Sequence, residues 1–347
     1  MIRDDRISYS HNVIHYVITI KKISGLVILT AFLLSPAFAE AMDGNYGFSI
    51  SSGIGVLYGH SEEIVYHFPK DDLYLSELLW DLKPLPYAGF SADFSPLDTS
   101  MKKGFIAALS FKAGIPVRSG ISENRDWFNP DPYYLTHYSK HNAYSRTVIL
   151  LDVSAGYFWR FTDSLALSVH GDFSYLHFSW SAKDGYAQYA VDYPWNSSIP
   201  KEYYKGEVMR YMQNWFILSP GVSLDWEMNR LFSFKTHINY SPLIYCADRD
   251  DHLLMNASFM DYLYFGHYLE SGGEFIFRAS RNTSLSLSLS YRRISGTRGD
   301  TFQQSWRLDY DTGNTVLQTR RYNDEAGAAF SALDLGFAVK FRLTGRG

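Results

Sequence analysis

Residues 285–291 read Leu-Ser-Leu-Ser-Leu-Ser-Tyr, a strict alternation of apolar and hydroxyl-bearing side chains. Successive side chains of a β-strand point to opposite faces, so this segment places its leucines on one face and its serines on the other. Residues 333–341, near the end of the chain, alternate in the same way, with Asp334 and Lys340 opposite a continuous apolar face. This pattern is typical of a strand that lies between lipid and a water-filled lumen.

Runs of this kind recur along the chain and predict ten strands in all. They cover residues 45–68, 72–92, 103–115, 143–160, 164–183, 207–227, 231–249, 257–278, 284–296 and 326–343. Ten is an even number, as a single-chain bacterial barrel requires. Several runs exceed the ~10 residues that cross a membrane, so those strands are expected to continue beyond it as a rim. The sequence therefore predicts an all-β protein, a ten-stranded antiparallel transmembrane β-barrel of outer-membrane type.

The segments between the runs differ in length. Residues 160–164 and 228–231 predict short turns, whereas residues 119–142, 184–206 and 298–325 are long and polar and predict loops. Outer-membrane barrels have short turns on the periplasmic side and longer loops outside. The chain is therefore expected in the bacterial outer membrane, in contact with its lipid and with the long loops facing outward.

The composition agrees with a barrel. The 347 residues include 27 Tyr and 24 Phe, yet the mean hydropathy is only −0.19. Aromatic girdles at both membrane interfaces, combined with a polar lumen, account for such a balance. The net charge of −4 gives no indication of a nucleic-acid partner.

The N-terminal segment has the features of a secretory signal peptide. Lys21 and Lys22 precede an apolar run over residues 23–34, and residues 37–39 read Ala-Phe-Ala, a cleavage motif. The run is too short for a transmembrane helix, which needs ~20 residues. We expect residues 1–39 to be removed and residues 40–347 to form a single β-barrel domain.

A charged cluster at residues 248–252 is the strongest candidate for chemistry. It reads Asp-Arg-Asp-Asp-His, so in a strand Asp248, Asp250 and His252 share one face. An aspartate beside a histidine raises the pKa of the imidazole and orients it, which gives a base that can activate water. A solvated charged loop is the alternative. The Gly and terminal Glu of a calcium loop are absent, and no metal or other cofactor is expected.

Four short motifs resemble those of the omptin family. Residues 55–66 (GVLYGHSEEIVY) look like the family's first-strand signature, and residues 76–80 (SELLW) match its S-x-L-x-W motif. Residues 124–127 (NRDW) resemble its D-x-D-W segment, and residues 248–252 match its D-x-D-x-H run. The motifs occur in family order, and the resemblance extends over most of the mature chain.

The resemblance implies a ten-stranded outer-membrane endopeptidase that cleaves beside basic residues, with Arg- or Lys-containing peptides as partners. By position, Asp250 and His252 would be the pair that activates the hydrolytic water. Asp126 would be one member of a facing carboxylate pair. Glu63 and Asp248 would form an acidic pocket for the basic side chain, which carboxylates select by charge.

One position departs from the family pattern, because Asn124 stands where the family has the other Asp of the carboxylate pair. Asn124 and Asp126 share a face, but an amide cannot share a proton as a carboxyl does. Glu123 is expected to point the other way unless a bulge re-aims it. Two functions therefore remain: an endopeptidase, or an impaired or inactive barrel that serves as a surface adhesin or scaffold. A passive pore is disfavoured, since side chains fill so narrow a barrel.

Overall fold

The computed structural model describes residues 46–68, 72–96, 101–128, 134–190, 193–308 and 315–343, and its regular elements are all β-strands. The expected signal peptide, residues 1–39, lies outside the described residues. No helix in the described part of the chain is long and apolar enough to cross a membrane. The strands are β1 (Tyr46–Tyr66), β2 (Tyr74–Pro96), β3 (Lys103–Gly114), β4 (Arg118–Asp126), β5 (His137–Thr162), β6 (Leu165–Tyr189), β7 (Glu202–Glu227), β8 (Phe232–Ser241), β9 (Ile244–His252), β10 (Ala257–Tyr264), β11 (His267–Arg278), β12 (Thr283–Ser295), β13 (Arg298–Leu308) and β14 (Thr315–Leu343).

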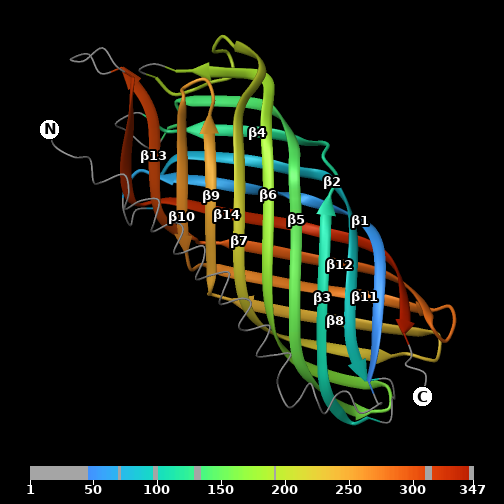
Figure 1. The fold of residues 1–347 in the computed structure, drawn as a ribbon. Helices are drawn as coiled ribbons and strands as arrows, with labels where there is room; N and C mark the ends of the chain where they lie inside the picture. The colour runs from blue at the N-terminus through green and yellow to red at the C-terminus, as the bar shows by residue number, and fades with distance from the viewer. Residues whose placement is uncertain are drawn as a thin grey trace.

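The strands form a closed barrel (Figure 1). Ten of them follow one another in the order β1-β2-β3-β5-β6-β7-β8-β11-β12-β14, and antiparallel pairing of β14 with β1 closes the ring. The predicted all-β, ten-stranded antiparallel barrel is thus confirmed. Closure leaves this ring without an unpaired sheet edge.

The remaining four strands continue the wall at one end of the barrel. β4 pairs with β2 and β5, the two neighbours of β3. β9 pairs with β7 and β10, β10 with β13, and β13 with β14. Ten long strands therefore make the wall, four of them interrupted midway. We call the end that these upper strands form the rim, and the end where β1 begins and β14 finishes the terminal end.

The predicted loops are wrong in their boundaries. Residues 119–142 contain most of β4 and the start of β5. Residues 184–206 contain the end of β6 and the start of β7, and residues 298–325 contain β13 and the first part of β14. β4 and β13 carry charged residues on their outer face, among them Arg125 and Asp300, so their sequences do not alternate as membrane-spanning strands do. The short turns predicted at residues 160–164 and 228–231 do lie at strand ends.

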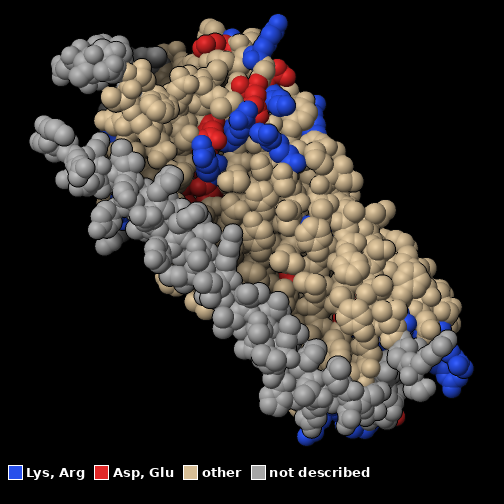
Figure 2. Space-filling view, in the orientation of Figure 1, with Lys and Arg blue, Asp and Glu red and all other residues tan. Residues whose placement is uncertain are grey.

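The outer wall is apolar between two charged ends. Leu333, Leu335 and Phe337 are exposed on β14, whereas Asp334 between them is buried inside the barrel. Figure 2 shows the same division on one face, where charged side chains gather near the rim and at the terminal end and leave a broad uncharged area between. This area has the character of a lipid-facing belt.

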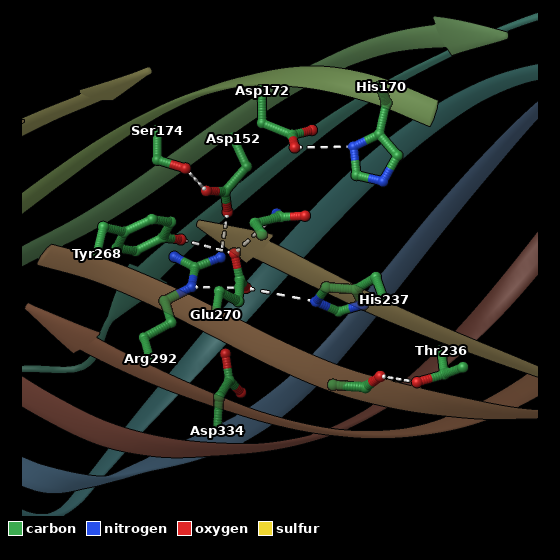
Figure 3. Close-up of polar contacts among 12 residues, drawn as sticks. Asp152, His170, Asp172, Ser174, Thr236, His237, Tyr268, Glu270, Arg292 and Asp334 are labelled. Carbon is green, nitrogen blue, oxygen red and sulfur yellow. Dashed lines mark hydrogen bonds and ion pairs between the residues drawn. The ribbon is translucent and has the colours of Figure 1, made fainter. Parts of the chain in front are cut away.

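The interior has two layers below the rim. The layer nearer the rim is aromatic: the buried Trp80 ring stacks on Tyr211 at 5.5 Å and lies 6.0 Å from Trp180, measured between ring centroids. Toward the terminal end lies a polar cavity of about 790 Å³. In it Arg292 pairs with Glu270 and with Asp152, each at 2.8 Å (Figure 3). The aromatic layer therefore separates the cavity from the rim.

Candidate active site

The candidate residues gather inside the rim, because the strands that carry them end there. Asp126 is the last residue of β4, and His252 is the last residue of β9. Glu63 lies three residues before the end of β1. On the outer face of β9 and of the neighbouring strand β7, Arg249 binds Asp251 and Arg210 binds Glu207. This height on the wall is therefore outside the lipid-facing belt.

Asp250 and His252 form an ion pair on the inner face of β9. The Oδ2 atom of Asp250 contacts Nε2 of His252, with the carboxylate buried and the imidazole partly open to solvent. Asp251 points outward and binds Arg249 at 2.9 Å. Burial lowers the pKa of His252, but the charge and hydrogen bond of Asp250 and the charge of Asp126 outweigh it, so the pKa is raised. Such an imidazole accepts a proton and then holds it beside a carboxylate.

Asp126 faces this pair from β4. Its Oδ1 accepts a hydrogen bond from the Ser76 hydroxyl at 2.7 Å, and its Oδ2 accepts one from the Asn124 amide at 3.1 Å. Burial raises the pKa of Asp126 to about 6, against the lowering effect of both hydrogen bonds and of the His252 charge. Asp126 is therefore the neighbour of both Asn124 and the imidazole.

Glu123 points away from the site, as expected from the alternation. Its carboxylate binds Arg125 at 3.2 Å and Lys140 at 3.3 Å on the other face of the wall. No carboxyl group of β4 besides Asp126 therefore turns toward His252.

Glu63 and Asp248 lie deeper in the rim, and both are buried. The Tyr211 hydroxyl donates to Oδ2 of Asp248 at 3.1 Å, and Gln213 donates to the Tyr211 hydroxyl at 2.7 Å. Burial and the charges of Asp250, Asp248 and Asp261 raise the pKa of Glu63 well above its ordinary value. The sequence-predicted residues of both sets are thus brought together at one rim.

Asp261 on β10 joins them and was missed from the sequence. It is the cross-strand neighbour of Asp248, it is buried, and burial raises its pKa to about 7. The signal was available: β9 and β10 flank a four-residue turn, so residues equidistant from that turn pair across the hairpin. Ser76 was also missed as a partner of Asp126, although it begins the S-x-L-x-W motif. Among the residues that the structure describes, no group of three or more His, Cys, Asp and Glu is arranged to hold a metal ion.

A closed ten-stranded barrel with a lipid-facing belt and a charged rim is typical of an outer-membrane β-barrel, and the candidate residues lie inside its rim. The chain belongs to the omptin family, whose sequence profile matches residues 44–343. The family assignment places it in the bacterial outer membrane. No curated protein matches the sequence.

A solved structure supports the fold. The outer membrane protease OmpT from Escherichia coli superimposes with a TM-score of 0.75, covering 86% of this chain and 97% of that one at 14% identity. The translocator domain of the autotransporter NalP from Neisseria meningitidis gives a TM-score of 0.34 at 10% identity, over 93% of this chain and 98% of that one. At 14% identity the likeness to OmpT concerns the fold alone.

Proposed function

We propose that the protein is an outer-membrane endopeptidase that cleaves peptides beside basic residues, with the rim facing the outside of the cell. The observation that carries the proposal is the Asp250–His252 pair, whose imidazole interacts electrostatically with Asp126 across the mouth of the barrel. A base and a facing carboxyl group around an open space are what the hydrolysis of a peptide by activated water requires.

In the proposed reaction, neutral His252 takes a proton from a water molecule as the water oxygen attacks the peptide carbonyl carbon. Asp250 stabilises the resulting imidazolium by charge and by its hydrogen bond. Asp126, protonated in part because its pKa is about 6, donates a hydrogen bond to the oxyanion. His252 then returns the proton to the amide nitrogen as the carbon–nitrogen bond breaks.

The proposed substrate pocket lies beside the reacting groups. Glu63 and Asp248 supply carboxylates for the Arg or Lys side chain next to the cleaved bond, and Asp248 is held in place by Tyr211 at 3.1 Å. A buried carboxylate selects a cation because only a cation offsets its loss of hydration.

The test uses purified, refolded protein and a fluorogenic peptide with two adjacent arginines. We expect wild-type protein to cleave it and His252→Ala to lose about 100-fold or more of that rate, the loss typical of a positioned base. His170→Ala is the matched control, because His170 forms an equivalent pair with Asp172 at 2.8 Å in the lower lumen (Figure 3). The control is expected to cleave at the wild-type rate.

The second candidate function is a non-enzymatic barrel that acts as an adhesin or scaffold. Asn124 favours it, because the amide next to Asp126 replaces the carboxyl that would share a proton. If the wild-type protein cleaves no faster than His252→Ala, only this non-enzymatic function remains.

A further inference from the structure

Four carboxyl groups meet inside the rim, more than the proposed reaction and pocket use. Asp250, Asp261, Glu63 and Asp248 are 1, 2, 4 and 5% exposed, respectively. Asp250 has the imidazole of His252 as its partner. Within the described ranges, no lysine or arginine forms an ion pair with the other three. They come from three strands: Glu63 from β1, Asp248 from β9 and Asp261 from β10.

Among Glu63, Asp248 and Asp261, two carboxyl oxygen atoms lack a donor. Neither Oε2 of Glu63 nor Oδ1 of Asp261 has a hydrogen-bond partner in the described part of the barrel. Asp261 is hydrogen-bonded by Thr301, its cross-strand neighbour on β13, and Asp248 is hydrogen-bonded by Tyr211. Buried carboxylate oxygens without donors are rare in folded proteins, because the loss of hydration goes uncompensated. The site is therefore short of positive charge and of N–H donors.

We propose that Asp261 is a third carboxylate of the substrate pocket, beside Glu63 and Asp248, and that it makes the pocket select arginine over lysine. The inference rests on the proposed function, in which this pocket takes a basic side chain. A guanidinium group has five N–H donors in one plane and can bind several carboxylates at once. An ammonium group has three donors and is more strongly hydrated, so it gains less from entering a buried pocket.

Binding of arginine is also expected to release protons. Burial raises the pKa of Asp261 to about 7, with a smaller contribution from the charge of Asp250. Burial and the charges of the neighbouring carboxylates raise the pKa of Glu63 well above its ordinary value. Asp261 is faced from β9 by Cys246, Asp248 and Asp250. Glu63 of β1, Tyr211 of β7 and Thr301 of β13 face it from the other strands. When no cation is bound, the carboxyl groups of Asp261 and Glu63 therefore carry protons at neutral pH. Binding of a guanidinium ion releases these protons.

The experiment measures binding rather than cleavage, so that it is independent of the chemistry. Full-length protein carrying His252→Ala is titrated with short peptides that contain arginine, lysine or citrulline, the neutral analogue of arginine. Calorimetry in two buffers of different ionisation enthalpy gives both affinity and proton release. Adding Asp261→Asn is expected to weaken arginine binding about 10- to 100-fold, the range for losing a hydrogen bond to a charged group. Lysine binding is expected to fall less.

The outcomes distinguish failure of the inferred pocket from failure of the proposed proteolysis. Citrulline binding should stay unchanged in Asp261→Asn, and proton release on arginine binding should decrease. The matched control is Asp251→Asn, which removes a carboxylate of the neighbouring strand β9 that binds Arg249 on the outer face. An equal loss for all three peptides, or arginine binding no tighter than citrulline before the substitution, would overturn the inference. Tight arginine binding by the His252→Ala protein, together with a wild type that cleaves nothing, would refute the proposed proteolysis and support the pocket.

Discussion

Asn124 determines whether the site has one carboxyl group or two on the β4 side. Its amide donates to Asp126 at 3.1 Å, where a second carboxyl could share a proton with Asp126 instead. We expect Asn124→Asp to raise the second-order rate constant for an arginine peptide about tenfold or more, toward the range of a positioned acid–base group. The measurement is kcat/KM with the fluorogenic peptide at pH 7.

The control for that substitution is Asn142→Asp on β5. Asn142 accepts a hydrogen bond from Arg118 at 2.6 Å rather than contacting Asp126, so the rate should not increase. Cleavage by Asn124→Asp at or below the wild-type rate would show that the amide is the functional group at this position.

The pH profile depends on His252. Its pKa is raised because Asp250 and Asp126 outweigh the effect of burial, and the neutral imidazole is the form that takes a proton from water. Activity should therefore be low in acid, where the imidazole is protonated, rise to a maximum, and fall again as Asp126, whose pKa is about 6, loses the proton that it donates to the oxyanion. Asp250→Asn removes the charge that raises the pKa of His252, so the profile should move to lower pH while the maximum falls.

The profile is obtained from kcat/KM between pH 5 and 9 for both proteins. Asp250→Asn keeps the shape of the side chain, which limits other changes to the buried site. An unshifted profile would mean that a group other than His252 controls the rate.

At the scale of strands, the sequence predicts the lower barrel better than the rim. β12 and β14 are recognisable because each runs between lipid and a polar lumen. Apolar and polar side chains therefore alternate at residues 285–291 and 333–341. β4 and β13 belong to the rim, where charged residues such as Arg125 and Asp300 lie on the outer face. Their sequences read as loops for that reason, although they pair along their length.

The same distinction applies to the site. The phase of β9 follows from its own sequence, so the shared face of Asp248, Asp250 and His252 was predictable. Asp261 reaches the site only through the register of β9 with β10, a relation between two strands. Single-strand periodicity carries no information on register, which the turn and the pairing decide.

The aromatic layer supports the pocket from below. Trp80 is fully buried and stacks on Tyr211, the residue that holds Asp248. We expect Trp80→Ala to destabilise the barrel by about 3–5 kcal/mol, the usual cost of removing a buried tryptophan. The KM for arginine peptides should also rise, because Tyr211 loses its packing partner. Urea unfolding in detergent and peptide kinetics measure the two effects.

Trp306→Ala is the comparison, since Trp306 on β13 is 59% exposed. Its removal should leave both quantities nearly unchanged. Equal destabilisation by the two substitutions would argue that the aromatic layer packs loosely and does not support the pocket.

The whole molecule combines three environments along one barrel axis. The lower lumen is polar and internally paired, as the contacts of Arg292 with Glu270 and Asp152 show. The aromatic layer then closes the barrel, and the acidic rim lies above it. A passage for solutes would have to cross that layer. The arrangement therefore argues against a continuous channel through the barrel.

The outer surface must match this division, and one substitution tests the match. Leu287 lies midway along β12 and is 53% exposed on the apolar wall, whereas Leu254 is 61% exposed in the turn between β9 and β10. Arginine at the bilayer midplane of a barrel costs about 2–4 kcal/mol and almost nothing near the interfaces. Leu287→Arg should therefore lower the stability of the barrel in lipid vesicles by about that amount, and Leu254→Arg should not. Urea titrations of protein folded into vesicles give the comparison. If the two variants lost equal stability, the belt would lie elsewhere on the wall, and the rim site would no longer stand clear of the membrane.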